Sequence, residues 1–368
     1  MEVINATRMP VACNMGLTVD GGELLVIVIK GTFVIPPNGS PVLLADVQLP
    51  HVMADVFAGE PGFSAPLWEA EFAPWKQQCD ISVIGHAHAR EGMQVTDMLT
   101  RVRVGSLEKS VRVVGDRTWQ WSLGKITTSA PRAFSQMALS YDGAFGGADR
   151  RHSDPARHGV FLANPVGRGW HRHLRRDWVD GEPLPNLEAP DDPVRSPDGH
   201  HRPMSFGVMG RNWAPRLGFA GTYDDRWLAE CFPFLPSDFD GRFYQSVAAD
   251  QQLDVPFAPL DVELTGFFAD GPRHFTIPHF DAPVHVIPRR GSREDLIAKL
   301  DTVVFEPDDS RFTLCWRATR PIAKSIHEIG QVVIGRKGAA WWQQRSTAAF
   351  PIPVVAAPSP TAATPLLV

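Results

Sequence analysis

Apolar runs rich in β-branched residues, each ended by proline or glycine, constrain the fold of this chain more than any other feature. The clearest is ELLVIVIKGTFVI, residues 23–35, which is followed by proline and the turn sequence NGS. β-branched residues favour strands, and Pro and Gly mark the places where strands end. The 33 Pro and 31 Gly among 368 residues suit many turns without reaching the proportion typical of disordered chains. The sequence therefore predicts a strand over residues 23–35 and a fold with many turns.

Runs of the same kind recur in the first and last thirds of the chain. In TRVRVGSLEKSVRVVGD, Val102 and Val104 alternate with Arg101 and Arg103. This period of two predicts a half-buried antiparallel hairpin that turns at residues 105–106. The sequence EPDDSR predicts the turn of a second hairpin further along the chain. Strands are predicted over residues 79–90, 98–106, 109–121, 260–268, 273–278, 282–289, 300–319 and 327–335.

Residues 131–260 lack this rhythm and contain Pro, Gly, Asp, Trp and Arg in close succession. A structureless loop of about 130 residues is not expected in a compact domain. The segment also carries too many large apolar side chains to be disordered, among them Trp227, Phe232 and Phe234. We predict an ordered irregular chain that packs against the sheets, with brief helical turns such as residues 224–232.

These patterns together predict a mainly β protein. Its antiparallel sheets are sandwich-like or divided between two β-lobes, and a long ordered irregular middle rich in Trp, Arg and Pro, with short helices, bridges them. We expect a single domain over residues 1–345, which is β-rich over 1–130 and 261–345 and irregular over 131–260. No charged residue follows Arg345, so residues 346–368 are predicted to form a flexible Pro/Ala tail.

Charge and hydropathy argue against two classes of partner. The formal net charge is −5, so the molecule as a whole is not built to bind a polyanion. No apolar run is long enough to span a membrane, and the first residues lack the basic and apolar regions of a signal peptide. We therefore expect a cytoplasmic protein that binds neither membranes nor nucleic acid.

Motifs of nucleophilic or phosphate chemistry are missing from the sequence. There is no GxSxG elbow. Five positions before Gly124 of the string WSLGKIT, where the first glycine of a phosphate-binding loop must stand, the chain has Trp119. The cysteines are far apart and form no CxxC pair, which predicts free buried thiols rather than a zinc site or a disulfide framework. They are Cys13, Cys79, Cys231 and Cys315. We predict no catalytic residue and no cofactor.

The pair His86 and His88 offers one alternative. In a strand, residues two apart point to the same face, and such HxH pairs bind metal in some hydrolases. Two ligands do not make a site, and a third and fourth would have to come from elsewhere. The competing interpretation is an exposed or edge-strand face, with Ile81, Val83 and Ala87 on the opposite side. A metal-dependent hydrolase that uses His86 and His88 therefore remains the alternative function.

The segment NPVGRGWHRHLRRDW, residues 164–178, combines glycines with many cationic and aromatic side chains. Seven arginines lie in residues 150–176, but residues 177–198 hold seven acids against one arginine. This opposite charge favours internal ion pairs or a protein interface over phosphate binding. Trp and Arg are also enriched at protein interfaces. The candidate partner-binding residues are Arg168, Trp170, Arg172, Arg175 and Arg176.

Several long strings resemble one bacterial family. They are DISVIGHAHA, RVRVGSLEKSVRVVGDRTW, YDGAFGG, NPVGRGW, LPNLEAP and FGVMGRNWAPRLGFAGTYDDRWLAECFPFLPSDFDGRFYQSVAADQQL. The chain is similar, from about residue 10 to 340, to a bacterial domain-of-unknown-function family encoded beside type VI secretion spike genes. It departs from that pattern at Asp142 and Gly143, where relatives often have a charged pair. The pentapeptide-repeat extension of some members is also missing.

The resemblance implies a role rather than a reaction. Several members of that family are regarded as adaptors or chaperones that load toxic effectors onto the spike, and none supplies a catalytic residue to carry over. It implies a bacterial cytoplasmic, non-enzymatic adaptor whose partners are a secreted effector and a component of the spike complex. We expect such a protein to be a monomer or weak dimer on its own.

Overall fold

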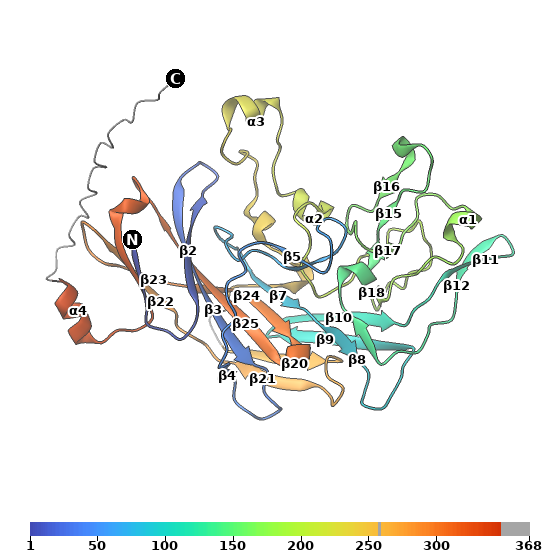
Figure 1. The fold of residues 1–368 in the computed structure, drawn as a ribbon, viewed down its shortest axis with the longest axis horizontal. Coiled ribbons are helices and arrows are strands. Elements are labelled where there is room, and N and C mark those ends of the chain that lie inside the picture. The colour runs from blue at the N-terminus through green and yellow to red at the C-terminus, as the bar shows by residue number, and fades with distance from the viewer. Residues whose placement is uncertain (257–258, 347–368) are drawn as a thin grey trace, which may run out of the picture.

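Strands dominate the structure, a computed structural model that describes residues 1–256 and 259–346 (Figure 1). The predicted mainly β fold is confirmed, and the described chain contains several mostly antiparallel sheets and only short helices. The predicted tail lies outside the described residues except for Ser346, which ends the last helix.

The largest sheet has seven strands in the order β19-β7-β24-β25-β3-β2, with β4 beside β3. Only β7 and β24 run parallel to each other in it. Its strands are β2 (Val11–Leu17), β3 (Glu23–Val34), β4 (Leu43–Leu44), β7 (Cys79–Val83), β19 (Gln252–Leu253), β24 (Lys299–Glu306) and β25 (Arg311–Pro321).

Two further sheets extend the structure. A five-stranded antiparallel sheet has the order β18-β10-β9-β20-β21, made of β9 (Asp97–Val104), β10 (Leu107–Val114), β18 (Leu187–Glu188), β20 (Leu260–Thr265) and β21 (Arg273–Ile277). A four-stranded sheet has the order β1-β26-β22-β23, made of β1 (Glu2–Asn5), β22 (Pro283–Pro288), β23 (Glu294–Ile297) and β26 (Ile329–Ile334).

Short pairs and helices complete the fold. The pairs are β5 (Val56–Phe57) with β6 (Pro66–Trp68), β8 (His86–His88) with β13 (Gln136–Ala138), β11 (Trp119–Ser122) with β12 (Lys125–Thr128), β14 (Phe145–Gly146) with β17 (Arg168–Gly169), and β15 (Ala148–Asp149) with β16 (Gly159–Val160). The α-helices are α1 (Arg176–Val179), α2 (Ala214–Leu217), α3 (Asp225–Glu230) and α4 (Ala339–Ser346). The 3-10 turns are η1 (Tyr141–Gly143), η2 (Pro155–Arg157), η3 (Gly241–Tyr244), η4 (Ala249–Gln251), η5 (Pro307–Asp309) and η6 (Ile326–Glu328).

The predicted hairpins form where the sequence places them. Val104 of β9 lies opposite Leu107 of β10 across the turn at residues 105–106. Val102 and Val104 are buried at 2% and 0% exposure while Arg103 is exposed, as the alternation predicts. The second hairpin joins β24 to β25 through η5.

Strands from the two ends of the chain share each of the larger sheets. β3 pairs with β25 over its length, β7 pairs with β24, and β9 pairs with β20. One apolar cluster joins the seven-stranded sheet to the five-stranded sheet. Within it the ring of Phe275 on β21 lies 5.5 Å from that of Phe312 on β25, measured between centroids. The core is therefore built jointly by the first and last thirds of the chain.

The other face of the seven-stranded sheet carries buried charge. On β3, Leu25, Ile27 and Ile29 belong to the main core, so Lys30 points to the opposite side. Lys30 forms an ion pair with Glu71 at 2.5 Å, although both side chains are buried. Residues 46–78 therefore cover this face through polar as well as apolar contacts.

All four cysteines carry free thiols, as predicted, but only Cys79 and Cys315 are buried, and Cys13 and Cys231 are partly exposed. Burial raises the pKa of Cys13 to about 11 and that of Cys79 and Cys315 well above the usual value. Nucleophilic attack needs the thiolate, and burial disfavours that form in these three side chains.

Candidate binding surfaces

Glycine and tryptophan shape the loop of residues 164–178. Gly169 has φ +89°, and a Cβ there would lie 2.6 Å from the Cδ of Pro185. A Cβ on Gly167 would lie 2.5 Å from the carbonyl oxygen of Ala144. These contacts let β17 run beside β14 and let Trp119 donate its indole N–H to the carbonyl of Gly169 at 3.0 Å. The glycines are therefore required by close backbone packing.

The five candidate residues of this loop do not share one surface. Arg168 is directed inward, and its guanidinium donates to the carbonyl oxygen of Asp142 at 2.9 Å and to Asn186 at 3.3 Å. Trp170 is half-buried and packs against the apolar cluster around Trp119. The side chains of Arg172, Arg175 and Arg176 are exposed.

The exposed arginines have modest internal contacts. Arg172 donates to the carbonyl oxygen of His158 at 2.7 Å, and Arg175 pairs with Asp177 at 2.8 Å and lies 4.3 Å from the ring centroid of Trp178. A further pair joins Arg151 of the basic segment to Glu182 of the acidic segment at 2.6 Å. Exposed ion pairs of this kind contribute about 0–1 kcal/mol each to the stability of the fold. They leave the arginines accessible to a partner.

His86 and His88 meet a carboxylate that sequence reasoning did not connect to them. His86 Nδ1 lies 2.7 Å from one oxygen of Asp308, and His88 Nε2 lies 2.8 Å from the other. The histidines donate in both bonds because the carboxylate accepts. Ala87 between them is fully buried, and the two histidine side chains are 40% and 25% exposed. The cluster ties β8 to the β24–β25 hairpin.

Within residues 1–256 and 259–346, no three His, Cys, Asp or Glu side chains are grouped so that they could hold a metal ion. In the His86–His88–Asp308 cluster, each carboxylate oxygen already accepts one imidazole N–H. The arrangement is that of a hydrogen-bonded bridge between two segments.

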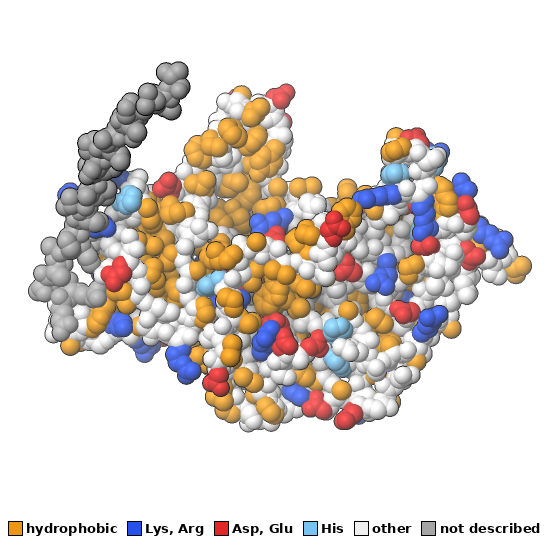
Figure 2. Space-filling model, in the orientation of Figure 1, with side chains coloured by type: hydrophobic (Ala, Val, Ile, Leu, Met, Phe, Trp, Pro, Cys, Tyr) orange, Lys and Arg blue, Asp and Glu red, His pale blue; other side chains and the backbone are white. Residues whose placement is uncertain are grey.

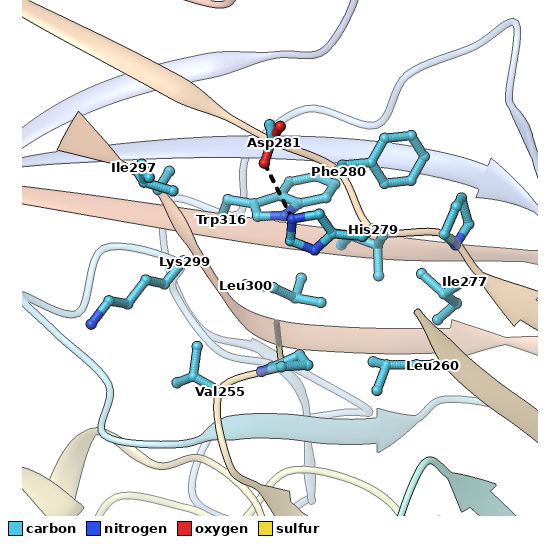
Figure 3. A pocket seen from close by; sticks show the side chains of 14 residues that line it. Val255, Leu260, Ile277, His279, Phe280, Asp281, Ile297, Lys299, Leu300 and Trp316 are labelled. Atoms are coloured by element: carbon cyan, nitrogen blue, oxygen red, sulfur yellow. Dashed lines mark hydrogen bonds and ion pairs between the residues drawn. The ribbon is translucent and has the colours of Figure 1, made fainter. Parts of the chain in front are cut away.

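A small apolar pocket lies where β20, β21, β24 and β25 meet (Figure 3). Leu260, Leu300 and Trp316 help to line it, and its volume is about 50 Å³. His279 and Asp281 also line it, and His279 Nε2 lies 3.2 Å from Asp281 Oδ1. Because apolar side chains dominate the lining, the pocket is a gap in packing and has little polar chemistry to offer.

Several exposed aromatic side chains lie together on a projection that we call the aromatic arm, residues 221–238. It carries α3 and stands away from the sheets (Figure 1). At its base the backbone N–H and hydroxyl of Thr222 donate to the two carboxylate oxygens of Asp238, at 2.9 and 2.8 Å. These hydrogen bonds hold the pKa of Asp238 below its usual value. The carboxylate therefore stays ionised and closes the base of the arm.

Local contacts organise the arm around Trp227. Asp224 caps α3 by accepting from the backbone N–H of Trp227 at 2.8 Å. The indole N–H donates to the carbonyl of Phe234 at 2.9 Å. Ring centroids of Tyr223 and Phe232 lie 4.8 and 5.6 Å from that of Trp227. A hydrogen-bonded tryptophan thus holds two further rings in place.

The outer side chains of the arm remain open to solvent. Tyr223, Leu228, Phe232 and Phe234 are 55%, 59%, 62% and 43% exposed. Figure 2 shows hydrophobic side chains over much of the arm, with acidic ones near its tip. Residues 224–232 do contain the predicted helical turn. The predicted packing against the sheets does not cover these outer side chains, because the arm projects from the body of the protein; Phe234 is partly covered where its ring lies against Gly21 of the β2–β3 turn.

Residues 20–317 match a family whose members are described as uncharacterized proteins conserved in bacteria, DUF2169. The chain belongs to the DUF2169 family. No curated protein and no solved structure matches it.

The part of this DUF2169 protein that matches the family runs from the β2–β3 turn into β25. It includes the loop of residues 164–178, the His86–His88 pair and the aromatic arm. Among the described residues, no helix combines the length and the apolar character that a membrane crossing requires.

Proposed function

We propose that this DUF2169 protein is a non-enzymatic adaptor or chaperone that binds a type VI secretion effector and assists its loading onto the spike complex. The aromatic arm carries the proposal, because it exposes several large apolar side chains on one projection. Exposed apolar patches on soluble proteins commonly mark interaction sites. The resemblance of the long central strings to the family encoded beside spike genes supplies the class of partner.

The proposal also covers the compartment in which the protein acts and its oligomeric state. An adaptor that loads cargo before secretion works in the bacterial cytoplasm. It should also keep its binding surface free of its own copies, so we expect a monomer or weak dimer in isolation. Light scattering on the purified protein tests this, and a tight large homo-oligomer would count against an adaptor.

Secretion in the producing bacterium tests the function directly. Deleting the gene should abolish release of the cognate effector while the secretion tube itself is still released. Wild-type protein supplied in trans should restore release, and tagged protein should capture the effector from the cytoplasm. Unchanged effector release after the deletion would refute the proposed function.

Metal analysis separates the adaptor from a metal-dependent hydrolase. In the adaptor, His86 and His88 serve only to bind Asp308, so purified protein should contain no stoichiometric metal. Stoichiometric zinc, manganese or iron that disappears in His88→Ala would support the hydrolase instead. If the protein is an adaptor, the His88→Ala variant should still capture the effector.

A further inference from the structure

We propose that the aromatic arm is the docking surface of this protein and that its occupant is an apolar helix face flanked by lysine or arginine on the partner. The proposal rests on the adaptor function and adds to it the site and the chemistry of the partner. Three properties of the arm carry it: its exposed apolar surface, its charge and its attachment.

The apolar surface of the arm is largely aromatic. Tyr223 and Phe232 flank Trp227 in ring contact, and Leu228 follows Trp227 on α3. The exposed fractions of Tyr223, Leu228 and Phe232 all exceed one half, at 55%, 59% and 62%. A partner helix that covers them would remove most of this surface from water, which is the main source of binding free energy.

The charge of the arm is strongly one-sided. Residues 221–238 contain four carboxylates, Asp224, Asp225, Glu230 and Asp238, and one cation, Arg226, which gives a net charge of −3. Arg226 pairs with Glu230 at 2.9 Å. No arginine, lysine or histidine of the described residues forms an ion pair with Asp224, Asp225 or Asp238. Complementarity therefore calls for cations around the apolar face of the partner.

The same charge argues against a second copy of this chain as the occupant. Two arms packed against each other would bring two net charges of −3 together at an interface that supplies no cation except Arg226. Like charges facing each other across an interface cost several kcal/mol. The arm is thus suited to a different protein.

The attachment of the arm holds it in a defined position. Thr222 and Asp238 close its base, and Phe234 lies against the β2–β3 turn, where a Cβ on Gly21 would be 2.9 Å from the ring. A surface that is positioned before binding loses less entropy when the partner arrives. The arm therefore presents its rings as a preformed site.

A pair of synthetic peptides tests the surface without knowledge of the natural partner. One is a fluorescein-labelled 18-residue helix with leucine on one face and lysine on its flanks, and the other replaces every lysine by glutamate. We expect wild-type protein to bind the lysine peptide at least about tenfold more tightly than the glutamate peptide, by fluorescence anisotropy. Amides of residues 221–238 should become protected from hydrogen exchange only with the lysine peptide.

Variants separate the arm from general attraction to an acidic protein. Leu228→Ser/Phe232→Ser should weaken binding of the lysine peptide at least tenfold, and Asp225→Lys should weaken it several-fold. Leu162→Ser removes another exposed apolar side chain, at 63% exposure, and should leave binding unchanged. Melting temperatures check that each variant is folded, and Leu228→Ser alone replaces the double variant if that variant melts early.

Two results would overturn the proposal. One is equal affinity of wild type and arm variants for the lysine peptide, and the other is equal affinity of wild type for both peptides. A dimer that the arm substitutions abolish would instead assign the surface to a second copy. If effector release depends on the protein but not on the arm substitutions, the arm is not the docking site and the adaptor function stands. If release does not depend on the protein at all, the adaptor function fails whatever the arm binds.

Discussion

Replacing Glu71 by Gln should destabilise the protein strongly, because it leaves a buried ammonium group without its counter-charge. The Lys30 side chain is 1% exposed and that of Glu71 is 7% exposed. The ammonium group contacts a Glu71 oxygen at 2.5 Å and the carbonyl oxygen of Pro50 at 3.1 Å, and it lies 4.9 Å from the ring centroid of Trp68. Glutamine keeps the size and one acceptor of Glu71 but removes the negative charge.

The expected loss follows from this burial. Breaking a buried ion pair on one side costs about 3–5 kcal/mol, which is a large part of a typical total stability of about 5–15 kcal/mol. At roughly 2 °C per kcal/mol, the melting temperature should fall by about 6–10 °C. Lys30→Met/Glu71→Gln removes both charges, and we expect it to recover most of the loss.

The pH dependence gives an independent readout. Burial alone would raise the pKa of Glu71, but the hydrogen bond from His51 and the charge of Lys30 outweigh it and hold the pKa below its usual value. A carboxyl whose pKa is lowered on folding stabilises the protein above its unfolded pKa of about 4.3 and loses this effect as the pH falls through the folded pKa. The difference between wild type and Glu71→Gln should therefore shrink as the pH falls below about 4.

Urea unfolding monitored by circular dichroism, at pH 7 and at steps down to pH 3, measures both quantities. A loss below about 1 kcal/mol at neutral pH would refute the reasoning, because the ammonium group would then not depend on its partner. A double variant no more stable than Glu71→Gln would refute it as well.

Other predictions concern the loop, the bridge and the glycines. Gly169→Ala should lower the free energy of unfolding by about 2–5 kcal/mol, because it adds a clash with Pro185 to a positive φ. Gly181 has φ +88° and no atom within 4 Å of an added Cβ, so Gly181→Ala should lower it by only about 1–2 kcal/mol. Equal losses in urea unfolding would contradict the close approach at Gly169. The loop of residues 164–178 is a second candidate contact for the effector beside the arm, so Arg172→Ala/Arg175→Ala/Arg176→Ala should reduce effector capture. The unfolding free energy should change by less than about 3 kcal/mol, since exposed ion pairs contribute about 0–1 kcal/mol each. Full capture by this triple variant would make the loop a scaffold only. Trp170→Ala should cost roughly 2 kcal/mol, less than the roughly 3–5 kcal/mol of the fully buried Trp119→Ala, because Trp170 is only half-buried. His88→Ala should change the unfolding free energy by about 1 kcal/mol or less, since its bond to Asp308 is partly exposed.

Local preferences predicted the longer strands and two of the hairpin turns, but they missed β1, β2 and β23, and the predicted strands 79–90 and 109–121 are each divided between two elements. Alternation of Val102 and Val104 with arginine placed the β9–β10 hairpin, and EPDDSR placed the turn between β24 and β25. Both are decided by neighbouring residues, which is the range over which periodicity and turn chemistry act. The mainly β class followed from the same signals.

Only the tertiary structure shows which strands pair with each other and which side chains are in contact. β3 pairs with β25, and Asp308 lies between His86 and His88. Each of these contacts joins segments more than 200 positions apart, and the two histidine hydrogen bonds span 222 and 220 residues. The sequence shows that Trp227, Phe232 and Phe234 are apolar, and this alone predicts that other parts of the protein bury them. The fold decides how far the sheets cover them: the arm leaves the body at Thr222 and Asp238, so Phe232 stays 62% exposed, whereas Phe234 is partly covered by the β2–β3 turn and Trp227 is half-buried within the arm. Burial depends on which distant segment reaches a side chain, whereas the periodicity and turn residues that predicted the strands lie within a few neighbouring positions.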